Sequence, residues 1–278
     1  MTINCNGNLI DLSTPKVMGI LNLTPDSFYD GGSYKDENDI VTKVDKMLAD
    51  GATFIDVGAY SSRPNATNIS VDEEINRIVP VIKLLVKKFP GILLSIDTFR
   101  SAVAKACLEN GAALINDISA GALDDKMMSV IAEYKVPYIM MHMRGTPETM
   151  QQLTEYTNVT LDIKQYFAKK LAQARALGII DLVVDPGFGF AKTTEQNFNI
   201  LQNLDLFKTM NVPILAGISR KSMIYKTLDT TANNALNGTT ALNTIALTKG
   251  ANILRVHDVK EAIECITLYT ALQLNETL

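Results

Sequence analysis

Short apolar segments that end on polar side chains recur along this chain, and they constrain its fold more than any other feature of the sequence. Helix-like stretches separate these segments, so the order indicates repeated strand–helix units with parallel strands. The carboxyl ends of parallel strands lie on one rim, and we expect the polar residues to collect there. They are Asn22, Asp56, Asp97, Asn116, Asp117, His142, Asp185, Ser219, Arg255 and His257.

About eight strands alternating with about eight helices predict an α/β fold, a closed (β/α)8 or TIM barrel, with an open doubly wound sheet as the alternative. The expected strands are 17–21, 53–57, 92–96, 114–117, 137–141, 182–184, 214–217 and 253–256. The expected helices are 40–50, 71–89, 102–109, 125–134, 159–177, 196–204, 238–249 and 260–274. Asn6-Gly7-Asn8 lies between two further short strands, and Asn-Gly favours a tight turn. We expect this N-terminal β-hairpin to close the barrel bottom.

Length and composition favour a single domain over residues 1–278. The chain has 278 residues, 47% of them hydrophobic, and no linker-like tract interrupts it, while a closed α/β barrel needs about 250 residues. The net charge is −4 without a Lys/Arg cluster, so nucleic acid is not an expected partner. The sequence has neither a signal-like start nor a membrane-spanning run, which predicts a cytoplasmic protein with no membrane partner. Cys5, Cys107 and Cys265 lack metal-ligand spacing and are expected to be reduced thiols.

Three of the polar strand ends form an acceptor-rich set. Asp97, Asn116 and Asp185 should point into one mouth, where two carboxylates and an amide suit a ligand with several N–H donors in one plane. The amino-pyrimidinone edge of a pterin or a guanine has that arrangement. The alternative is that each residue caps the helix after its strand.

Cationic and hydroxyl groups follow the last two strands. Ser219-Arg220-Lys221-Ser222 comes directly after one strand, and Arg255 and His257 share a face of the next. With Asn22 and helix N-terminal amides, they predict a site for a phosphate or carboxylate. Taken singly, Lys221 would more simply be a surface salt-bridge residue and His257 a satisfied polar residue.

The segment Asp185-Pro186-Gly187-Phe188-Gly189-Phe190 predicts a sharp exit from a strand. Phe188 and Phe190 could stack on a flat ring, or either could fill the core. His142, within a Met-rich strand, is more simply a buried residue than a ligand. Two long connections, 24–38 and 60–70, are read as lids. No zinc-type motif is present, so any metal is expected to be Mg²⁺ held by substrate oxygens and one neutral side chain.

Nine segments of this sequence together carry a resemblance to a known family. The chain closely resembles the dihydropteroate synthase family over nearly its whole length. The matching segments are MGILNLTPDSF (18–28), IDVG (55–58), SSRP (61–64), SIDT (95–98), INDI (115–118), MHMRGTP (141–147), DPGFGFAK (185–192), GISRKS (217–222) and RVH (255–257).

The resemblance implies a Mg²⁺-dependent transferase of folate biosynthesis. Its small-molecule substrates would be 6-hydroxymethyl-7,8-dihydropterin diphosphate and p-aminobenzoate, and its products 7,8-dihydropteroate and pyrophosphate. We interpret the reaction as a dissociative substitution in which carboxylates stabilise a pterin cation and cationic groups stabilise the departing diphosphate. The resemblance also implies a pterin-binding TIM barrel, and we expect a homodimer that pairs through helix 260–274.

The family's site residues carry over onto matching positions of this sequence. Catalytic roles would fall to Asp97, Asp185, Lys221, Arg255, His257, Asp26 and Arg63. The pterin would contact Asp97, Asn116, Asp185 and Lys221, with Met140 and Gly217 lining its pocket. The diphosphate would contact Ser62, Arg63, Arg255 and His257, and Mg²⁺ would bind Asn22. The p-aminobenzoate site would include Phe190, Lys221 and Ser222, and segments 24–28 and 60–65 would be the lids.

The second lid departs from the family pattern at two positions. Tyr60 and Asn65 stand where the family usually has Glu and Gly, which affects lid conformation and p-aminobenzoate binding. Two alternatives remain, a pterin-binding methyltransferase of the same barrel type and a non-catalytic relative. A Schiff-base aldolase using Lys221 is weaker, because a charged and solvated neighbourhood would leave the pKa of that lysine near its usual value.

Overall fold

The computed structural model describes residues 1–23, 29–30, 33–34, 37–61 and 68–275, and within them eight parallel strands form a barrel. The strands lie in the order β10-β9-β8-β7-β6-β3-β12-β11, and a parallel bridge from Val184 to Ile214 brings the two ends of this order together. The predicted (β/α)8 barrel is therefore confirmed, and the open sheet is not. The strands are β3 (Lys16–Asn22), β6 (Phe54–Gly58), β7 (Leu94–Asp97), β8 (Leu114–Asp117), β9 (Tyr138–Met141), β10 (Leu182–Asp185), β11 (Leu215–Ala216) and β12 (Ile253–Val256).

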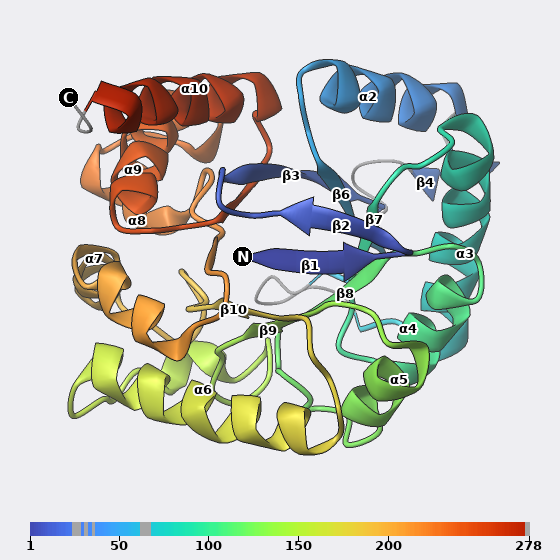
Figure 1. The fold of residues 1–278 in the computed structure, drawn as a ribbon, viewed down its shortest axis with the longest axis horizontal. Coiled ribbons are helices and arrows are strands. Elements are labelled where there is room, and N and C mark those ends of the chain that lie inside the picture. The colour runs from blue at the N-terminus through green and yellow to red at the C-terminus, as the bar shows by residue number, and fades with distance from the viewer. Residues whose placement is uncertain (24–28, 31–32, 35–36, 62–67, 276–278) are drawn as a thin grey trace.

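Helices surround the strands (Figure 1). They are α2 (Glu37–Ala49), α3 (Val71–Lys88), α4 (Ser101–Leu108), α5 (Met127–Tyr134), α6 (Val159–Ala176), α7 (Thr194–Gln202), α8 (Ser222–Thr227), α9 (Leu236–Thr248) and α10 (Val259–Asn275), with 3₁₀ turns η1 (Met150–Gln152), η2 (Leu204–Met210) and η3 (Ala232–Asn234). The predicted helices agree within a few residues. The sequence analysis missed α8, which is only six residues long, and the small hairpin of β4 (Tyr29–Asp30) and β5 (Ser33–Tyr34).

The N-terminal hairpin closes the bottom of the barrel, as predicted. Strands β1 (Thr2–Cys5) and β2 (Asn8–Asp11) pair antiparallel. Asn6 and Gly7 both adopt positive φ, at 51° and 85°, which a two-residue hairpin turn requires. The hairpin lies across the centre of the view in Figure 1. It buries Ile3, Cys5 and Leu12 against the lowest layer of inward-facing strand residues.

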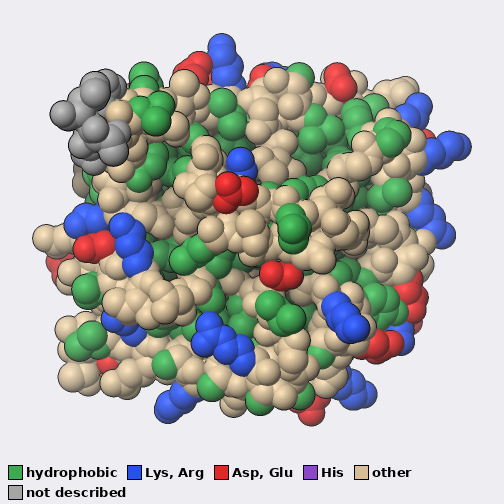
Figure 2. Space-filling model, in the orientation of Figure 1, with side chains coloured by type: hydrophobic (Ala, Val, Ile, Leu, Met, Phe, Trp, Pro, Cys, Tyr) green, Lys and Arg blue, Asp and Glu red, His purple; other side chains and the backbone are tan. Residues whose placement is uncertain are grey.

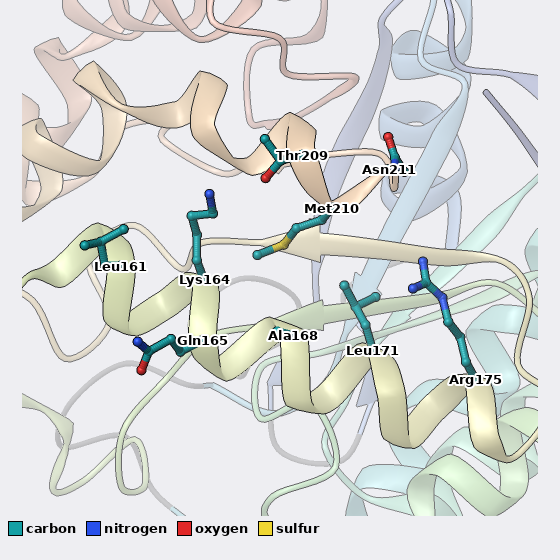
Figure 3. A pocket seen from close by; sticks show the side chains of 9 residues that line it. All are labelled: Leu161, Lys164, Gln165, Ala168, Leu171, Arg175, Thr209, Met210 and Asn211. Atoms are coloured by element: carbon teal, nitrogen blue, oxygen red, sulfur yellow. The ribbon is translucent and has the colours of Figure 1, made fainter.

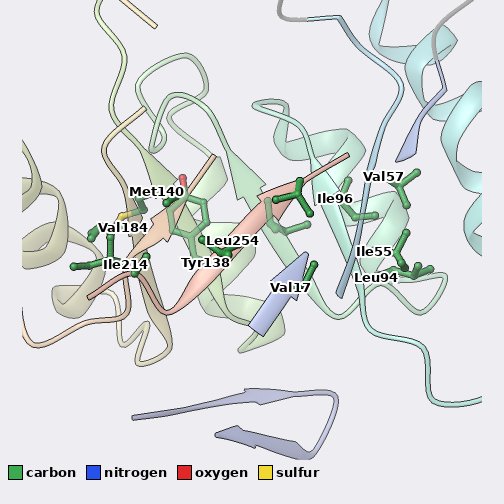
Figure 4. Close-up of a cluster of buried hydrophobic side chains, with 14 of the residues drawn as sticks. Val17, Ile55, Val57, Leu94, Ile96, Tyr138, Met140, Val184, Ile214 and Leu254 are labelled. Atoms are coloured by element: carbon green, nitrogen blue, oxygen red, sulfur yellow. The ribbon is translucent and has the colours of Figure 1, made fainter. Parts of the chain in front are cut away.

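The two-residue period of the strands separates the core from the site. Outward-facing residues such as Val17, Ile55 and Leu94 are fully buried beneath the helices (Figure 4). Inward-facing residues begin at the bottom with an apolar layer that includes Met18, Phe54, Leu114, Ile139, Val183 and Ile253. One step further along each strand the inward residue is often polar, as at Asp56, Ser95, Asn116, Asp185 and Arg255. The mouth of the barrel therefore has a polar floor above an apolar plug.

The face of the molecule nearest the hairpin carries charges of both signs without a continuous patch of one sign (Figure 2). Among the helices of the described residues, none combines the length and the apolar character needed to cross a bilayer.

Candidate active site

A small cavity lies at the carboxyl ends of the strands. Its walls come from β7, β8, β9, β10 and β12 and from the loops that follow β8, β10 and β11. It is lined by Asp97, Asn116, Ile118, Met141, Asp185, Phe190, Gly217, Lys221 and Arg255. The volume is about 30 Å³, which is enough to hold water.

Arg255 joins two carboxylates across the cavity. Its Nε lies 2.6 Å from Asp56 Oδ2, and its Nη2 lies 2.6 Å from Asp97 Oδ2. Burial lowers the pKa of Arg255, but the two carboxylates outweigh this effect and the net shift is upward. The guanidinium group therefore bridges the side chains of β6 and β7 from β12.

Asp56 belongs to the site, although the sequence analysis gave it no role. Its Oδ2 accepts hydrogen bonds from Arg255 and from Asn116 Nδ2, the latter at 3.1 Å. Asp56 is fully buried. The sequence does single out Asp56 as a polar residue within the second predicted strand, and such residues were expected to collect at the rim.

Asp97 and Asp185 are the carboxylates that line the cavity. Burial raises the pKa of Asp97 to about 7, and the guanidinium group of Arg255 limits the rise. Burial also raises the pKa of Asp185, opposed by the ammonium group of Lys221 and by a hydrogen bond from the Gly187 N–H at 2.8 Å. The predicted convergence of Asp97, Asn116 and Asp185 is present.

Lys221 lies beside Asp185 and the turn after β10. Its Nζ donates a hydrogen bond to the carbonyl of Phe188 and lies 4.8 Å from the centre of the Phe190 ring. Burial lowers the pKa of Lys221 to about 8, and Asp185 limits the fall. The expectation of a solvated lysine with its usual pKa was wrong, because the turn after β10 covers the side chain.

Arg220 does not contribute a free cation to the mouth. Its Nε and Nη2 bind Asp258 at 2.8 Å each, and its Nη1 donates to the carbonyls of Ala232 and Asn233. The backbone of Arg220 is left-handed, with φ of 55°. These bonds offset the strain and fix the backbone next to Lys221.

His257 and Ser219 face each other across the ends of β11 and β12. Ser219 Oγ lies 3.0 Å from His257 Nδ1. Burial lowers the pKa of His257 to about 4, and the positive charge of Arg255 adds to this effect. At neutral pH the ring is therefore uncharged and offers hydrogen bonds rather than a positive charge. Neither His257 nor Asn22, the last residue of β3, lines the small cavity.

Met140 does not line the pocket, and this assignment is corrected. It is fully buried on the outer face of β9, among the core side chains of Figure 4, and Met141 lines the cavity instead. Adjacent strand residues face opposite sides, so an offset of one position moves a side chain from the mouth to the core. The two aromatic residues of the turn after β10 lie in different places: Phe188 lies in the core, and Phe190 lies in the wall of the cavity.

The other predicted site residues either do not line the cavity or fall outside the described part of the chain. Asp26, Ser62 and Arg63 fall outside the described residues, and the lid segments 24–28 and 60–65 do so except for Tyr60 and Ser61. Ser222 is the first residue of α8 and does not line the cavity. The Tyr60 ring packs edge-on against Phe99, 5.1 Å between centroids, beneath Arg100.

A metal would find few protein ligands in the described part of the chain. No group of three His, Cys, Asp or Glu side chains there could hold a metal ion. Asn22 offers one amide oxygen at the end of β3, beside β12. A single neutral oxygen fits Mg²⁺, which takes most of its ligands from substrate phosphates and water.

A larger depression, about 600 Å³, lies on the outer surface between α6 and η2 (Figure 3). Leu161, Lys164, Arg175 and Met210 are among its lining residues, none of which is a carboxylate. It contains none of the predicted site residues and lies away from the strand ends.

Comparison with known proteins identifies a related family. Residues 18–257 match the family described as pterin binding enzyme. The chain is 41% identical over 277 residues to the dihydropteroate synthase of Escherichia coli K12, which covers 98% of this chain and 96% of that one. It is 39% identical to the Haemophilus influenzae dihydropteroate synthase, with 98% of each chain covered.

Solved structures give the same result. The dihydropteroate synthase of Yersinia pestis, in complex with a sulfonamide drug, superposes with a TM-score of 0.92 at 38% identity, covering 98% of this chain and 99% of that one. The Xanthomonas albilineans dihydropteroate synthase with 4-aminobenzoic acid has a TM-score of 0.90 at 35% identity, with 98% of each chain covered.

Proposed function

This chain belongs to the dihydropteroate synthases, transferases of folate biosynthesis within the pterin-binding enzymes, and we propose from its site that it joins 6-hydroxymethyl-7,8-dihydropterin diphosphate to p-aminobenzoate. The products are 7,8-dihydropteroate and pyrophosphate. The observation that carries the proposal is the convergence of Asp97, Asn116, Asp185 and Lys221 on one cavity beside Arg255.

The acceptor groups of the floor suit the pterin. The oxygens of Asp97, Asn116 and Asp185 match the amino and ring N–H groups of the pterin, and Lys221 supplies a donor for a ring acceptor. Asp97 Oδ2 already accepts a hydrogen bond from Arg255, and because a carboxylate can accept several hydrogen bonds, Asp97 can accept from the pterin as well.

The bond that breaks joins the exocyclic methylene carbon of the pterin to the diphosphate oxygen, which leaves with the electron pair. Asp97 and Asp185 stabilise the positive charge that develops on the pterin, while Arg255 binds the departing anion and neutral His257 donates a hydrogen bond to it. The amine of p-aminobenzoate then attacks the methylene carbon and loses a proton. The apolar wall of Ile118, Met141 and Phe190 limits the access of water to this carbon.

Asn22 is the residue we propose to hold Mg²⁺ with the diphosphate. When bound, the ion would neutralise diphosphate charge. The protein contributes the amide oxygen of Asn22 and the hydrogen bonds of the neighbouring His257.

The test is to mix the two substrates with the purified protein and Mg²⁺ and to measure pyrophosphate and dihydropteroate together. Equal release of both supports the proposal. A pterin-binding methyltransferase or a non-catalytic relative releases no pyrophosphate, and that outcome would reject it. Omitting Mg²⁺ and adding a chelator tests the metal separately, through the rate and through binding of pyrophosphate by calorimetry.

Inhibition by a sulfonamide is a further test of the aryl-amine site. A sulfonamide carries the aniline ring and an acidic group in place of the carboxylate, so it should compete with p-aminobenzoate and not with the pterin.

We also propose a homodimer that pairs through α10, where Leu268 and Leu272 are exposed one turn apart. Sedimentation equilibrium of the protein and of a Leu268→Glu variant tests this arrangement.

A further inference from the structure

Lys192 is a buried cation that the proposed reaction does not use. The side chain is 6% exposed. Its Nζ lies 2.9 Å from the carbonyl oxygen of Gly187, 2.8 Å from that of Phe190 and 3.3 Å from that of His142. The same nitrogen lies 3.1 Å from His142 Nδ1. An ammonium group has three hydrogens to donate, and these acceptors can take all of them.

The groups within hydrogen-bonding distance of Lys192 Nζ are hydrogen-bond acceptors. Burial lowers the pKa of His142 to about 2, and the cation of Lys192 adds to this effect. His142 is therefore neutral and accepts through Nδ1. Burial lowers the pKa of Lys192 well below its usual value, and the carboxylate of Asp185 opposes this effect. Lys192 thus ties the end of β9 to the turn after β10.

The turn after β10 is left-handed at three residues. Gly187, Gly189 and Ala191 have φ of 73°, 81° and 49°. The glycines adopt this conformation readily, whereas Ala191 has a Cβ atom and is strained. The turn also approaches the backbone of His142 closely, since a Cβ at Gly187 would lie 2.2 Å from the His142 carbonyl oxygen.

The turn held by Lys192 touches three groups of the cavity. Phe188 lies in sequence between Gly187 and Phe190, whose carbonyls Lys192 binds, and its own carbonyl accepts the hydrogen bond from Lys221. The Phe190 ring forms the cavity wall beside Lys221. The N–H of Gly187 donates to Asp185. Displacement of this turn therefore moves the Phe190 ring, the carbonyl that accepts from Lys221 and the N–H that donates to Asp185.

We infer that Lys192 is a positioning residue, whose ammonium group holds the turn after β10 in the conformation that places Phe190 and the Phe188 carbonyl against Lys221. It touches neither substrate and acts through Phe190 and Lys221. The inference rests on the proposed function, because its consequence is measured as a change in substrate binding.

Three variants separate an effect on the position of the turn from an effect on the stability of the protein. Lys192→Met keeps the length of the side chain and removes all donors, and Lys192→Gln keeps an amide that can donate to two of the carbonyls. The matched control is Tyr166→Phe, which removes one partly buried hydrogen bond, from the Tyr166 hydroxyl to the Ser119 carbonyl at 2.9 Å, in the loop after β8. The measurements are thermal midpoint, the KM for p-aminobenzoate, kcat, and the dissociation constant of 6-hydroxymethylpterin from its own fluorescence.

We expect Lys192→Met to raise both the KM for p-aminobenzoate and the pterin dissociation constant by about tenfold or more, since buried carbonyls left without donors rearrange the turn. Lys192→Gln should give a smaller rise in both, and it provides the measurement if the Met variant does not fold. Tyr166→Phe should lower the thermal midpoint and leave both binding values unchanged.

The inference is overturned if the Lys192 variants lose thermal stability as the control does but bind both ligands as the unmodified protein does. It is also overturned if only kcat falls. Failure of the unmodified protein to release pyrophosphate rejects the proposed function instead, and pterin fluorescence still measures the effect of Lys192 on binding.

Discussion

The charge state of Asp97 decides how the mouth of the barrel works at the scale of single residues. Asp97 accepts from Arg255 at 2.6 Å, and burial holds its pKa near 7. Near neutral pH its carboxyl group is therefore divided between the protonated form and the ion pair with Arg255.

Replacing Asp97 by Asn should lower kcat by on the order of 10²-fold or more, because a preorganised negative charge next to the developing cation is lost. Single-turnover measurements of pyrophosphate release check this expectation. Asp205→Asn, on the outer surface near Lys249, is the control and should keep its activity. Near-normal turnover of Asp97→Asn contradicts the carboxylate role.

The same carboxyl group makes stability depend on pH. Its pKa rises from 3.8 unfolded to about 7 folded, so its contribution to stability is present below about pH 4 and is lost as the pH rises through about 7. The free energy of unfolding of the unmodified protein should therefore fall relative to that of Asp97→Asn over this range. Urea titrations across the range measure the difference, and parallel curves would exclude the raised pKa.

At the scale of elements, the turns that follow the strands set the geometry of the site more than the strands do. The turn after β10 is left-handed at three alternating residues and carries the wall of the cavity. Arg220, after β11, has φ of 55° and is held by Asp258. Both turns are fixed by buried or paired cations, so their strain is compensated by neighbouring elements.

Gly187→Ala should destabilise the protein by about 3 kcal/mol, since it adds a Cβ both at positive φ and against the His142 carbonyl. The matched control is Gly178→Ala, where φ is 80° but nothing lies within 4 Å of the added Cβ. That change should cost about 1 kcal/mol from strain alone. Urea unfolding compares the two variants, and equal losses would show that the close approach to β9 contributes nothing.

At the scale of the whole molecule, the barrel separates stability from chemistry. The hairpin and the apolar layer fill the bottom, and the polar layer and the cavity occupy the opposite end. Changes to the hairpin should therefore alter the free energy of unfolding without altering the reaction.

Ile3→Ala should lower the free energy of unfolding by about 3 kcal/mol, because Ile3 is buried in the plug. Leu9→Ala, 74% exposed on the same hairpin, should change it by less than about 0.5 kcal/mol. Kinetics measured per folded molecule should match the unmodified protein for both. A large loss of kcat in Ile3→Ala would show that the plug is coupled to the mouth.

Much of the fold and part of the candidate site could be predicted from local pattern. The alternation of apolar runs and helices predicted the closed barrel and the rim, and Asn6-Gly7 predicted the hairpin because its turn needs positive φ at both residues. Asp97, Asn116, Asp185, Lys221 and Arg255 could be named because they end or follow strands. The roles proposed for them, including those of Asp26 and Arg63, remain predictions.

The sequence by itself determined the barrel, its closed bottom and the rim where polar groups meet, because periodicity and turn chemistry are local properties of a chain. Tertiary structure alone decided which groups pair across that rim. The register of β9 turned Met140 to the core and Met141 to the cavity, Arg255 joined Asp56 to Asp97 from strands 199 and 158 residues away, and Lys192 bound the turn after β10 to β9. Each of these depends on distances between segments far apart in the chain, which only packing fixes.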